Sequence, residues 1–69
     1  MDRQSVSSSN IVSIGYEEAS ETLEVEFTNG RIYQYYNVPA FMFEQMTTAT
    51  SVGQFFNANI KNAYSCSQV

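Results

Sequence analysis

Apolar and polar residues alternate in the first half of the chain, which predicts strands. Residues 11–16 are apolar and β-branched, and residues 22–27 alternate strictly, as in a strand with one buried face. Asn29-Gly30 follows, and this dipeptide is a strong hairpin signal because both central residues of a type I′ turn need positive φ angles. Residues 32–36 form the third apolar segment. The first half is therefore predicted to be a three-stranded antiparallel meander.

A helical period replaces the alternation after Pro39, a residue that suits the first turn of a helix. Apolar residues at three- and four-residue spacing predict an amphipathic helix over residues 39–48. Ser51 and Gln54 have the spacing of a capping box, which predicts that a second helix begins there. We therefore expect an α+β fold of βββαα order, with both short helices packed on one face of the sheet. The predicted core comprises Ile14, Leu23, Val25, Phe27, Ile32, Phe41, Met46, Phe55 and Ile60.

The predicted faces of the hairpin depend on the length of its loop. A two-residue Asn29-Gly30 loop would place Leu23 opposite Tyr36, and directly opposed residues share a face of the sheet. Tyr33 and Tyr35 would then point away from the helices. The same outer face would carry Glu24, Glu26 and Arg31.

One residue disagrees with this register. Gln34 would fall on the apolar face opposite Val25, where its amide would need hydrogen-bond partners. A bulge would resolve the conflict and would turn part of the strand over. The outward tyrosines are either a binding surface or a face that a helix or the N-terminal arm covers.

The chain has 69 residues, enough for one domain that buries only about 60% of the surface of its unfolded form. The single Cys66 excludes an internal disulfide, and without histidine the usual zinc sites cannot be built. Self-association is the remaining way to stabilise so small a core, so we expect a homo-oligomer, a dimer or tetramer. Polar, serine-rich residues 1–9 predict a flexible N-terminal arm, followed by a domain at residues 10–65 and a tail at residues 66–69.

Neither an apolar leader nor an apolar run of membrane-spanning length occurs in the sequence. A free thiol also fits a reducing compartment. We therefore expect a cytoplasmic protein that is not inserted in a membrane, located in a bacterial cell or, if a phage encodes it, in the host cytoplasm.

Catalysis has few candidates, because histidine, the usual general base near neutral pH, is absent. Glu24 and Glu26 could approach one another on one strand face, but alternating glutamates are more often the solvent-exposed side of a strand. No third group of oxygen ligands accompanies them, and the glycines are isolated, so neither a metal nor a cofactor is indicated. We expect a protein without enzymatic activity.

Ligand binding has more candidates. The two tyrosines would offer faces on which bases stack, two basic side chains could each meet a phosphate, and the amides at the start of the second helix could hold an anion. With a net charge of −4, this set suits one or two phosphates better than a long nucleic acid. The candidate ligand-binding residues are Tyr33, Tyr35, Arg31, Lys61, Ser51 and Gly53.

Short motifs occur in a fixed order along most of the chain: Ser8-Ser-Asn10-Ile, Ile14-Gly-Tyr16, Leu23-Glu-Val-Glu-Phe27, Asn29-Gly30, Tyr33-Gln-Tyr35, Val38-Pro39 and Ser51-Val-Gly-Gln-Phe55-Phe-Asn57, then Ile60 and Tyr64. Over about residues 8–64 they resemble the KTSC domain, a small module named from the C-terminus of some lysyl-tRNA synthetases. The family also occurs as stand-alone proteins in bacteria and phages.

The resemblance implies a central Tyr-x-Tyr motif, here Tyr33 and Tyr35, and an association with RNA binding. Many members end in a basic tail, whereas the end of this chain carries the single basic residue Lys61. That departure argues against general affinity for RNA.

Three functions remain open at this point. The favoured hypothesis is a non-enzymatic nucleotide-binding module, such as a phage or bacterial protein that sequesters a small cyclic nucleotide signal as an oligomeric sponge. The first alternative is an RNA-binding module, as the family resemblance suggests. The second alternative is a protein interaction module that uses the Tyr33/Tyr35 face of the sheet.

Overall fold

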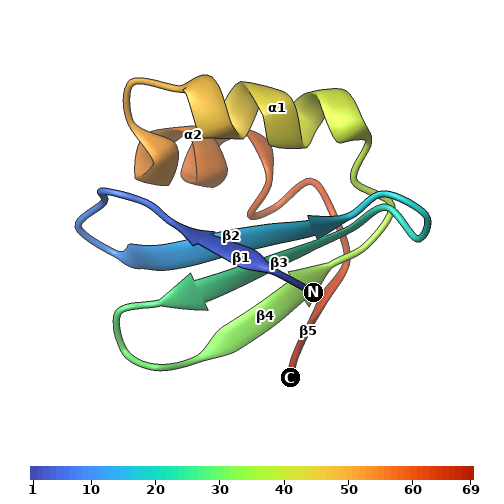
Figure 1. The fold of residues 1–69 in the computed structure, drawn as a ribbon, viewed down its shortest axis with the longest axis horizontal. Coiled ribbons are helices and arrows are strands. Elements are labelled where there is room, and N and C mark those ends of the chain that lie inside the picture. Colours follow the sequence, from blue (N-terminus) through green and yellow to red (C-terminus); the bar gives the residue numbers. More distant parts are fainter.

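A computed structural model describes all 69 residues, which form one antiparallel sheet with two helices on one of its faces (Figure 1). The strands follow one another in the sheet in chain order, β1 to β5. The fold is α+β, and the predicted meander is its central part. The strands are β1 (Arg3–Ser5), β2 (Ile11–Glu17), β3 (Thr22–Phe27), β4 (Ile32–Tyr35) and β5 (Cys66–Gln68), and the helices are α1 (Ala40–Thr48) and α2 (Val52–Asn59).

The two ends of the chain differ from the sequence prediction. Residues 3–5, predicted to be part of a flexible arm, pair with β2 as strand β1. Residues 66–68, predicted to be a tail, pair with β4 as strand β5. Both strands are polar and only three residues long, so they carry no apolar alternation that would identify them, and the partner of β5 is also distant in the sequence. Five strands therefore replace the predicted three.

The β3–β4 hairpin has a three-residue loop, and this corrects the predicted register. The Gly30 amide donates to the Phe27 carbonyl, and the Phe27 amide donates to the Arg31 carbonyl, both at 2.9 Å. Gly30 alone adopts a positive φ, of 89°, whereas Asn29 does not. A type I turn closed by one left-handed glycine has this pattern, and a two-residue type I′ loop does not.

The extra loop residue moves β4 by one position and turns it over. Leu23 lies opposite Tyr35, and Val25 lies opposite Tyr33, so both tyrosines point toward the helices. The prediction that they point outward is wrong. Gln34 instead occupies the outer face, where its amide donates to the Glu24 carboxylate at 2.9 Å. The conflict that Gln34 presented in the predicted register was therefore the sign of this shift.

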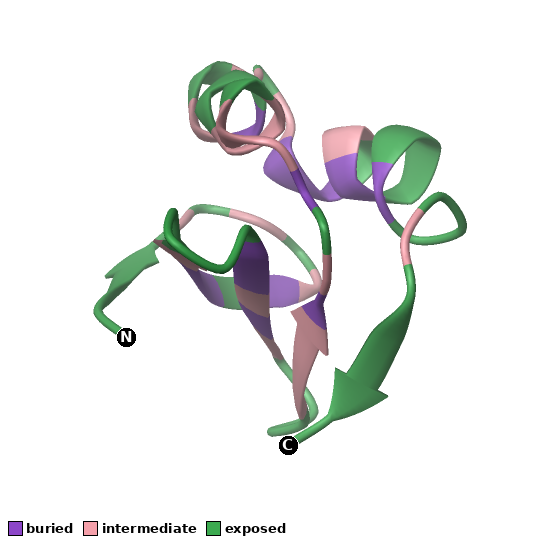
Figure 2. Ribbon diagram, turned by 90° about the vertical axis from the view of Figure 1, so that its right-hand side faces the viewer, coloured by how far each residue is buried: buried purple, intermediate pink, exposed green.

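The core lies between the sheet and the helices, where Figure 2 shows the buried segments meeting. Five of the predicted core residues are fully buried, namely Ile14, Leu23, Val25, Met46 and Ile60. Phe27 and Phe55 pack against this cluster but remain partly exposed. Ile32 faces outward because of the register shift, and Phe41 is 57% exposed on α1, so these two predictions were wrong. Buried apolar residues absent from that core list are Ile11, Tyr35, Val38, Val52 and Phe56.

No helix covers the second face of the sheet, which carries polar side chains. Arg3 on β1 lies over Gly15 of β2 and reaches two carboxylates on β3. Its Nε lies 3.5 Å from Glu24 Oε2, and its Nη2 lies 3.8 Å from Glu26 Oε1. A Cβ on Gly15 would lie 2.8 Å from the Arg3 side chain, so the missing side chain leaves the space that Arg3 crosses. This ion pair links the first strand to the third.

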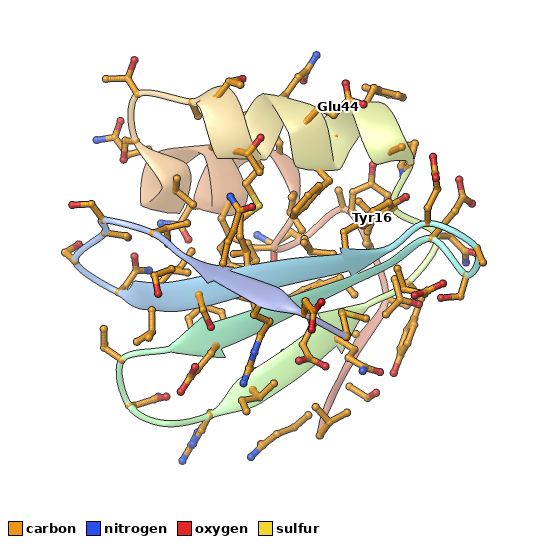
Figure 3. The ribbon with its side chains drawn as sticks, viewed as in Figure 1. Tyr16 and Glu44 are labelled. Carbon is orange, nitrogen blue, oxygen red and sulfur yellow. The ribbon has the colours of Figure 1, made fainter.

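Val38 joins the sheet to the helical layer. Its amide donates to the Glu21 carbonyl at 2.9 Å, and its carbonyl accepts a hydrogen bond from the Tyr16 hydroxyl. The Tyr16 ring stacks on Phe43 of α1 with the ring centroids 5.1 Å apart. Figure 3 shows Tyr16 between the sheet and α1, whereas Glu44 points away from the sheet. Helix α1 begins two residues after Val38, so the two hydrogen bonds of the Val38 backbone fix where the chain leaves the sheet and enters the helix.

Neither helix is both long enough and apolar enough to cross a bilayer.

Candidate polar ligand-binding cleft

The chain has one cavity, a polar cleft of about 590 Å³ between the segment that precedes β2 and the start of α2. Figure 1 shows these two segments side by side at one end of the molecule. Every lining residue except one glycine has a hydroxyl or carboxamide side chain, and none is charged or apolar. The lining residues are Ser7, Ser8, Ser9, Asn10, Thr50, Ser51, Gly53, Gln54 and Asn57.

The start of α2 supplies one wall of the cleft. The Ser51 hydroxyl accepts a hydrogen bond from the backbone amide of Gln54 at 3.2 Å and so caps the helix. The predicted capping position is therefore confirmed, although the Gln54 side chain makes no reciprocal bond to the Ser51 amide. The remaining amides of this first turn, those of Val52 and Gly53, lie at the positive end of the helix dipole.

The segment before β2 supplies the other wall and touches the helix at Gly53. A Cβ on Gly53 would lie 2.7 Å from Asn10 Oδ1 and 3.0 Å from Ser8 Oγ. A contact of 2.7 Å is essentially never seen for a real Cβ atom, so any larger residue at this position would displace the Asn10 side chain from the helix. The Ser8 hydroxyl donates to Asn10 Oδ1 at 3.0 Å, which holds the two side chains in place against the helix.

The open side of the cleft carries side chains with unused hydrogen-bonding capacity. Gln54 and Asn57 are exposed on α2, and no hydrogen bond within the chain engages their side-chain amides. Each carboxamide offers two N–H donors and one carbonyl acceptor. The cleft holds no titratable side chain, so its chemistry is that of hydrogen bonding by neutral groups. No three potential ligands among His, Cys, Asp and Glu lie close enough together to hold a metal ion.

Of the six predicted ligand-binding residues, Ser51 and Gly53 line this cleft. Arg31, at the end of the hairpin loop, and Lys61, just after α2, are exposed and lie outside it. Tyr33 and Tyr35 also lie outside it, on the helix-facing side of the sheet. The predicted set is therefore divided, and the structure does not bring it together as one site.

Tyr35 cannot serve as a stacking platform, because it is 5% exposed and its ring contacts Phe56 edge-on with centroids 5.3 Å apart. Burial, with smaller contributions from the Cys66 thiol and from Tyr33, raises the pKa of Tyr35 to about 12. Tyr33 is partly buried, and its ring meets Phe27 in an edge contact with centroids 5.8 Å apart. The two phenols that the sequence placed at a binding surface are part of the packing.

Sequence reasoning missed the wall formed by residues 7–10, together with Thr50, Gln54 and Asn57. Residues 7–9 were assigned to a flexible arm, because a serine-rich terminus usually remains disordered. A signal was available in the two clusters of serine and asparagine, one before the first predicted strand and one around the second helix start. Their proximity in space, however, depends on how the helices fold back over the sheet.

Comparison with known proteins identifies the family. A family model described as KTSC domain matches residues 7–64, which include both walls of the cleft. The chain belongs to the KTSC family. A solved structure of a KTSC domain protein from Yersinia pestis superposes with a TM-score of 0.94 at 40% sequence identity, over 99% of this chain and 96% of that one.

Similar sequences occur both as small proteins and as parts of larger ones. A protein of Tsukamurella paurometabola is 41% identical over 84% of this chain and 87% of its own length. A lysine–tRNA ligase of Nostoc punctiforme is 38% identical over 86% of this chain, but the match spans only 10% of the ligase. The KTSC domain is therefore similar to complete small proteins and to one short segment of the ligase.

Proposed function

We propose that this KTSC domain is a non-enzymatic binding module that holds a small nucleotide by its sugar and phosphate groups in the polar cleft. The observation that carries the proposal is the cleft itself, two walls of hydroxyls and amides meeting at the start of α2. Its volume of about 590 Å³ lies within the range of about 300–1,000 Å³ that small-molecule sites occupy.

The lining groups favour this class of ligand. Phosphate and ribose oxygens accept and donate hydrogen bonds, and hydroxyls, carboxamides and helix amides can satisfy both roles without a charged side chain. Because no aromatic ring lines the cleft, the base of the nucleotide would extend outward rather than stack. The residues that line the cleft offer no titratable group as a general acid or base, which supports the proposal of binding without turnover, as in a sponge.

Charge argues against a long nucleic acid as the ligand. The chain has a net charge of −4 with three basic residues, and one of these, Arg3, is already paired with Glu24 and Glu26. Neutralising several phosphates with released counterions needs more cations than the remaining Arg31 and Lys61 supply. The occurrence of similar segments in lysine–tRNA ligases nevertheless makes a short RNA the natural competing ligand in the test.

The test is a thermal-shift screen with inorganic phosphate, mononucleotides, cyclic mono- and dinucleotides and a short single-stranded RNA. We expect at least one small nucleotide to raise the melting temperature in a concentration-dependent way, as mass action requires. Asn57→Ala should weaken the shift about tenfold in ligand concentration, since it removes hydrogen bonds to the ligand.

Asn59→Ala is the matched control, because this residue lies on the same helix but outside the cleft. It should leave the shift unchanged. A shift that Asn57→Ala does not alter would place the site elsewhere on the molecule. If only the RNA shifts the melting temperature, or if no compound in the panel does, small-nucleotide binding is refuted.

A further inference from the structure

Strand β5 presents an unpaired backbone edge. In an antiparallel pair, residues that exchange backbone hydrogen bonds alternate with residues whose N–H and C=O groups point away from the partner. The Tyr36 amide donates to the Ser65 carbonyl, and the Val69 amide donates to the Ile32 carbonyl. Given the register of β4 and β5, Ser67 bonds inward in the same way. The backbone groups of Cys66 and Gln68 therefore point out of the sheet.

The opposite edge of the sheet is open in the same way but differs in its side chains. On β1, the Val6 amide bonds to the Val12 carbonyl, so the backbone groups of Arg3 and Ser5 point outward. Charged residues on an edge strand discourage pairing with another strand. Asp2 and Arg3 provide such charges at the β1 edge. The β5 strand has no charged side chain, no proline and no bulge.

We infer that β5 pairs with β5 of a second copy, antiparallel, about a two-fold axis. A strand of neutral residues meets its own copy without like-charge repulsion, and an isologous pair repeats every hydrogen bond by symmetry. The result is one continuous ten-stranded sheet built from two five-stranded ones. Figure 2 shows β5 exposed at the rim of the molecule, where neither helix covers it.

One register uses all of the outward backbone groups. It places Cys66 opposite the partner's Gln68 and Gln68 opposite the partner's Cys66, which makes four inter-subunit hydrogen bonds. The two Ser67 residues then face each other at the axis as a non-hydrogen-bonded pair, about 4.5 Å apart between Cα atoms. The two Cys66 residues lie two positions out of register, about 8 Å apart, which is beyond the reach of a disulfide.

This geometry makes a cross-linking prediction specific to one position. In a Cys66→Ser background, Ser67→Cys should form an inter-subunit disulfide on mild oxidation, because facing non-hydrogen-bonded pairs have the Cα separation that a disulfide needs. The wild-type chain, whose thiols are out of register, should remain uncross-linked under the same conditions. Ser5→Cys in the same Cys66→Ser background, on the other edge, is the control and should also remain uncross-linked.

Proline scanning tests the same edge without cysteine. Light scattering across a concentration series should show that the fraction of dimer increases with protein concentration. Gln68→Pro removes an outward amide but no bond to β4, so it should weaken self-association about tenfold while the circular dichroism spectrum is retained. Ser5→Pro makes the equivalent change at the β1 edge and should have no effect on mass.

Three results would each overturn the inference. The first is a protein that stays monomeric into the millimolar range. The second is a dimer that Gln68→Pro leaves intact. The third is a dimer in which Ser67→Cys fails to cross-link. Loss of the dimer with Ser5→Pro rather than Gln68→Pro would assign the interface to β1 instead.

Discussion

Neighbouring side chains on β3 face opposite environments, and the polarity of each side chain suits the environment that it faces. Val25 is fully buried against the helices, whereas Glu24 and Glu26 lie on the uncovered face. Both carboxylates have hydrogen-bond or ion-pair partners there, from Gln34, Ser13 and Arg3. Partly exposed ion pairs contribute little to stability, so the burial of the apolar residue is the larger effect.

Val25→Asp should unfold the protein. The substitution places an unpaired carboxylate at a position that is 0% exposed, and such a change costs about 4 kcal/mol or more. In a domain of 69 residues this approaches the whole free energy of unfolding. Far-ultraviolet circular dichroism would show loss of the cooperative thermal transition.

Val12→Asp is the matched control for that experiment. Val12 lies at the irregular point in the β2–β3 pairing and is 40% exposed, so its carboxylate would remain hydrated. Its cost should stay near 0.5 kcal/mol, as for surface substitutions generally. Equal destabilisation by the two variants would contradict the assignment of the covered face.

At the scale of elements, local patterns located the three central strands and both helices, because alternation, proline and capping signals act within a few residues. They did not determine the register, because Asn29-Gly30 fits both a two-residue and a three-residue loop, and only Gly30 adopts a positive φ. The amide of Gln34, which a two-residue loop would have buried, was the sequence signal that favoured the longer loop. Edge strands β1 and β5 had no such signal, since three polar residues carry no apolar alternation.

The cleft was half predictable for the same reason. Ser51 and Gly53 follow from the helix start, a local feature, and both line the cleft. The opposite wall depends on how α2 returns to the segment before β2. Its traces in the sequence are the serine and asparagine clusters and a glycine on the helix, at which a Cβ would lie 2.7 Å from Asn10 Oδ1.

The attachment of β1 depends on Gly15. Gly15→Ala would place a Cβ 2.7 Å from the Asp2 carbonyl and 2.8 Å from the Arg3 side chain. Backbone cannot move aside as freely as a side-chain tip, so β1 should shift away from β2 at a cost of about 1–3 kcal/mol. Urea unfolding would measure that loss, and limited proteolysis should cut the first residues faster than in the wild type.

Arg3→Met separates this backbone effect from loss of the ion pair. It keeps a long side chain over Gly15 and removes only the contacts with Glu24 and Glu26, so it should cost less than about 1 kcal/mol. Equal costs for the two variants would mean that the ion pair, and not the close backbone approach, holds β1.

For the whole molecule, buried phenols make stability fall at alkaline pH. The pKa of Tyr35 rises from 10.0 to about 12 on folding, and burial also raises the pKa of Tyr16. Between pH 10 and about 12 the unfolded chain has released the Tyr35 hydroxyl proton, whereas the folded chain retains it. The contribution of these phenols to stability should therefore be constant below about pH 9 and decrease as pH rises from about 10 to 12.

Thermal unfolding at a series of alkaline pH values tests this expectation. Tyr35→Phe keeps the ring against Phe56 and removes the titrating hydroxyl, so the decrease with pH should become shallower than in the wild type. Tyr16 would still contribute a decrease in the variant. An unchanged slope would show that Tyr35 does not titrate across this window.

The position of Val38 between the two layers has a consequence for dynamics. Its amide lies outside every helix and strand, yet it is bonded to Glu21, and its side chain is fully buried. Amides in connecting segments usually exchange with solvent deuterium quickly, through small local openings. Releasing this one would require the end of β2, the β2–β3 turn and the start of α1 to separate together. Its exchange should therefore be as slow as that of the central strands, which would mark a linker residue as part of the most stable unit of the fold.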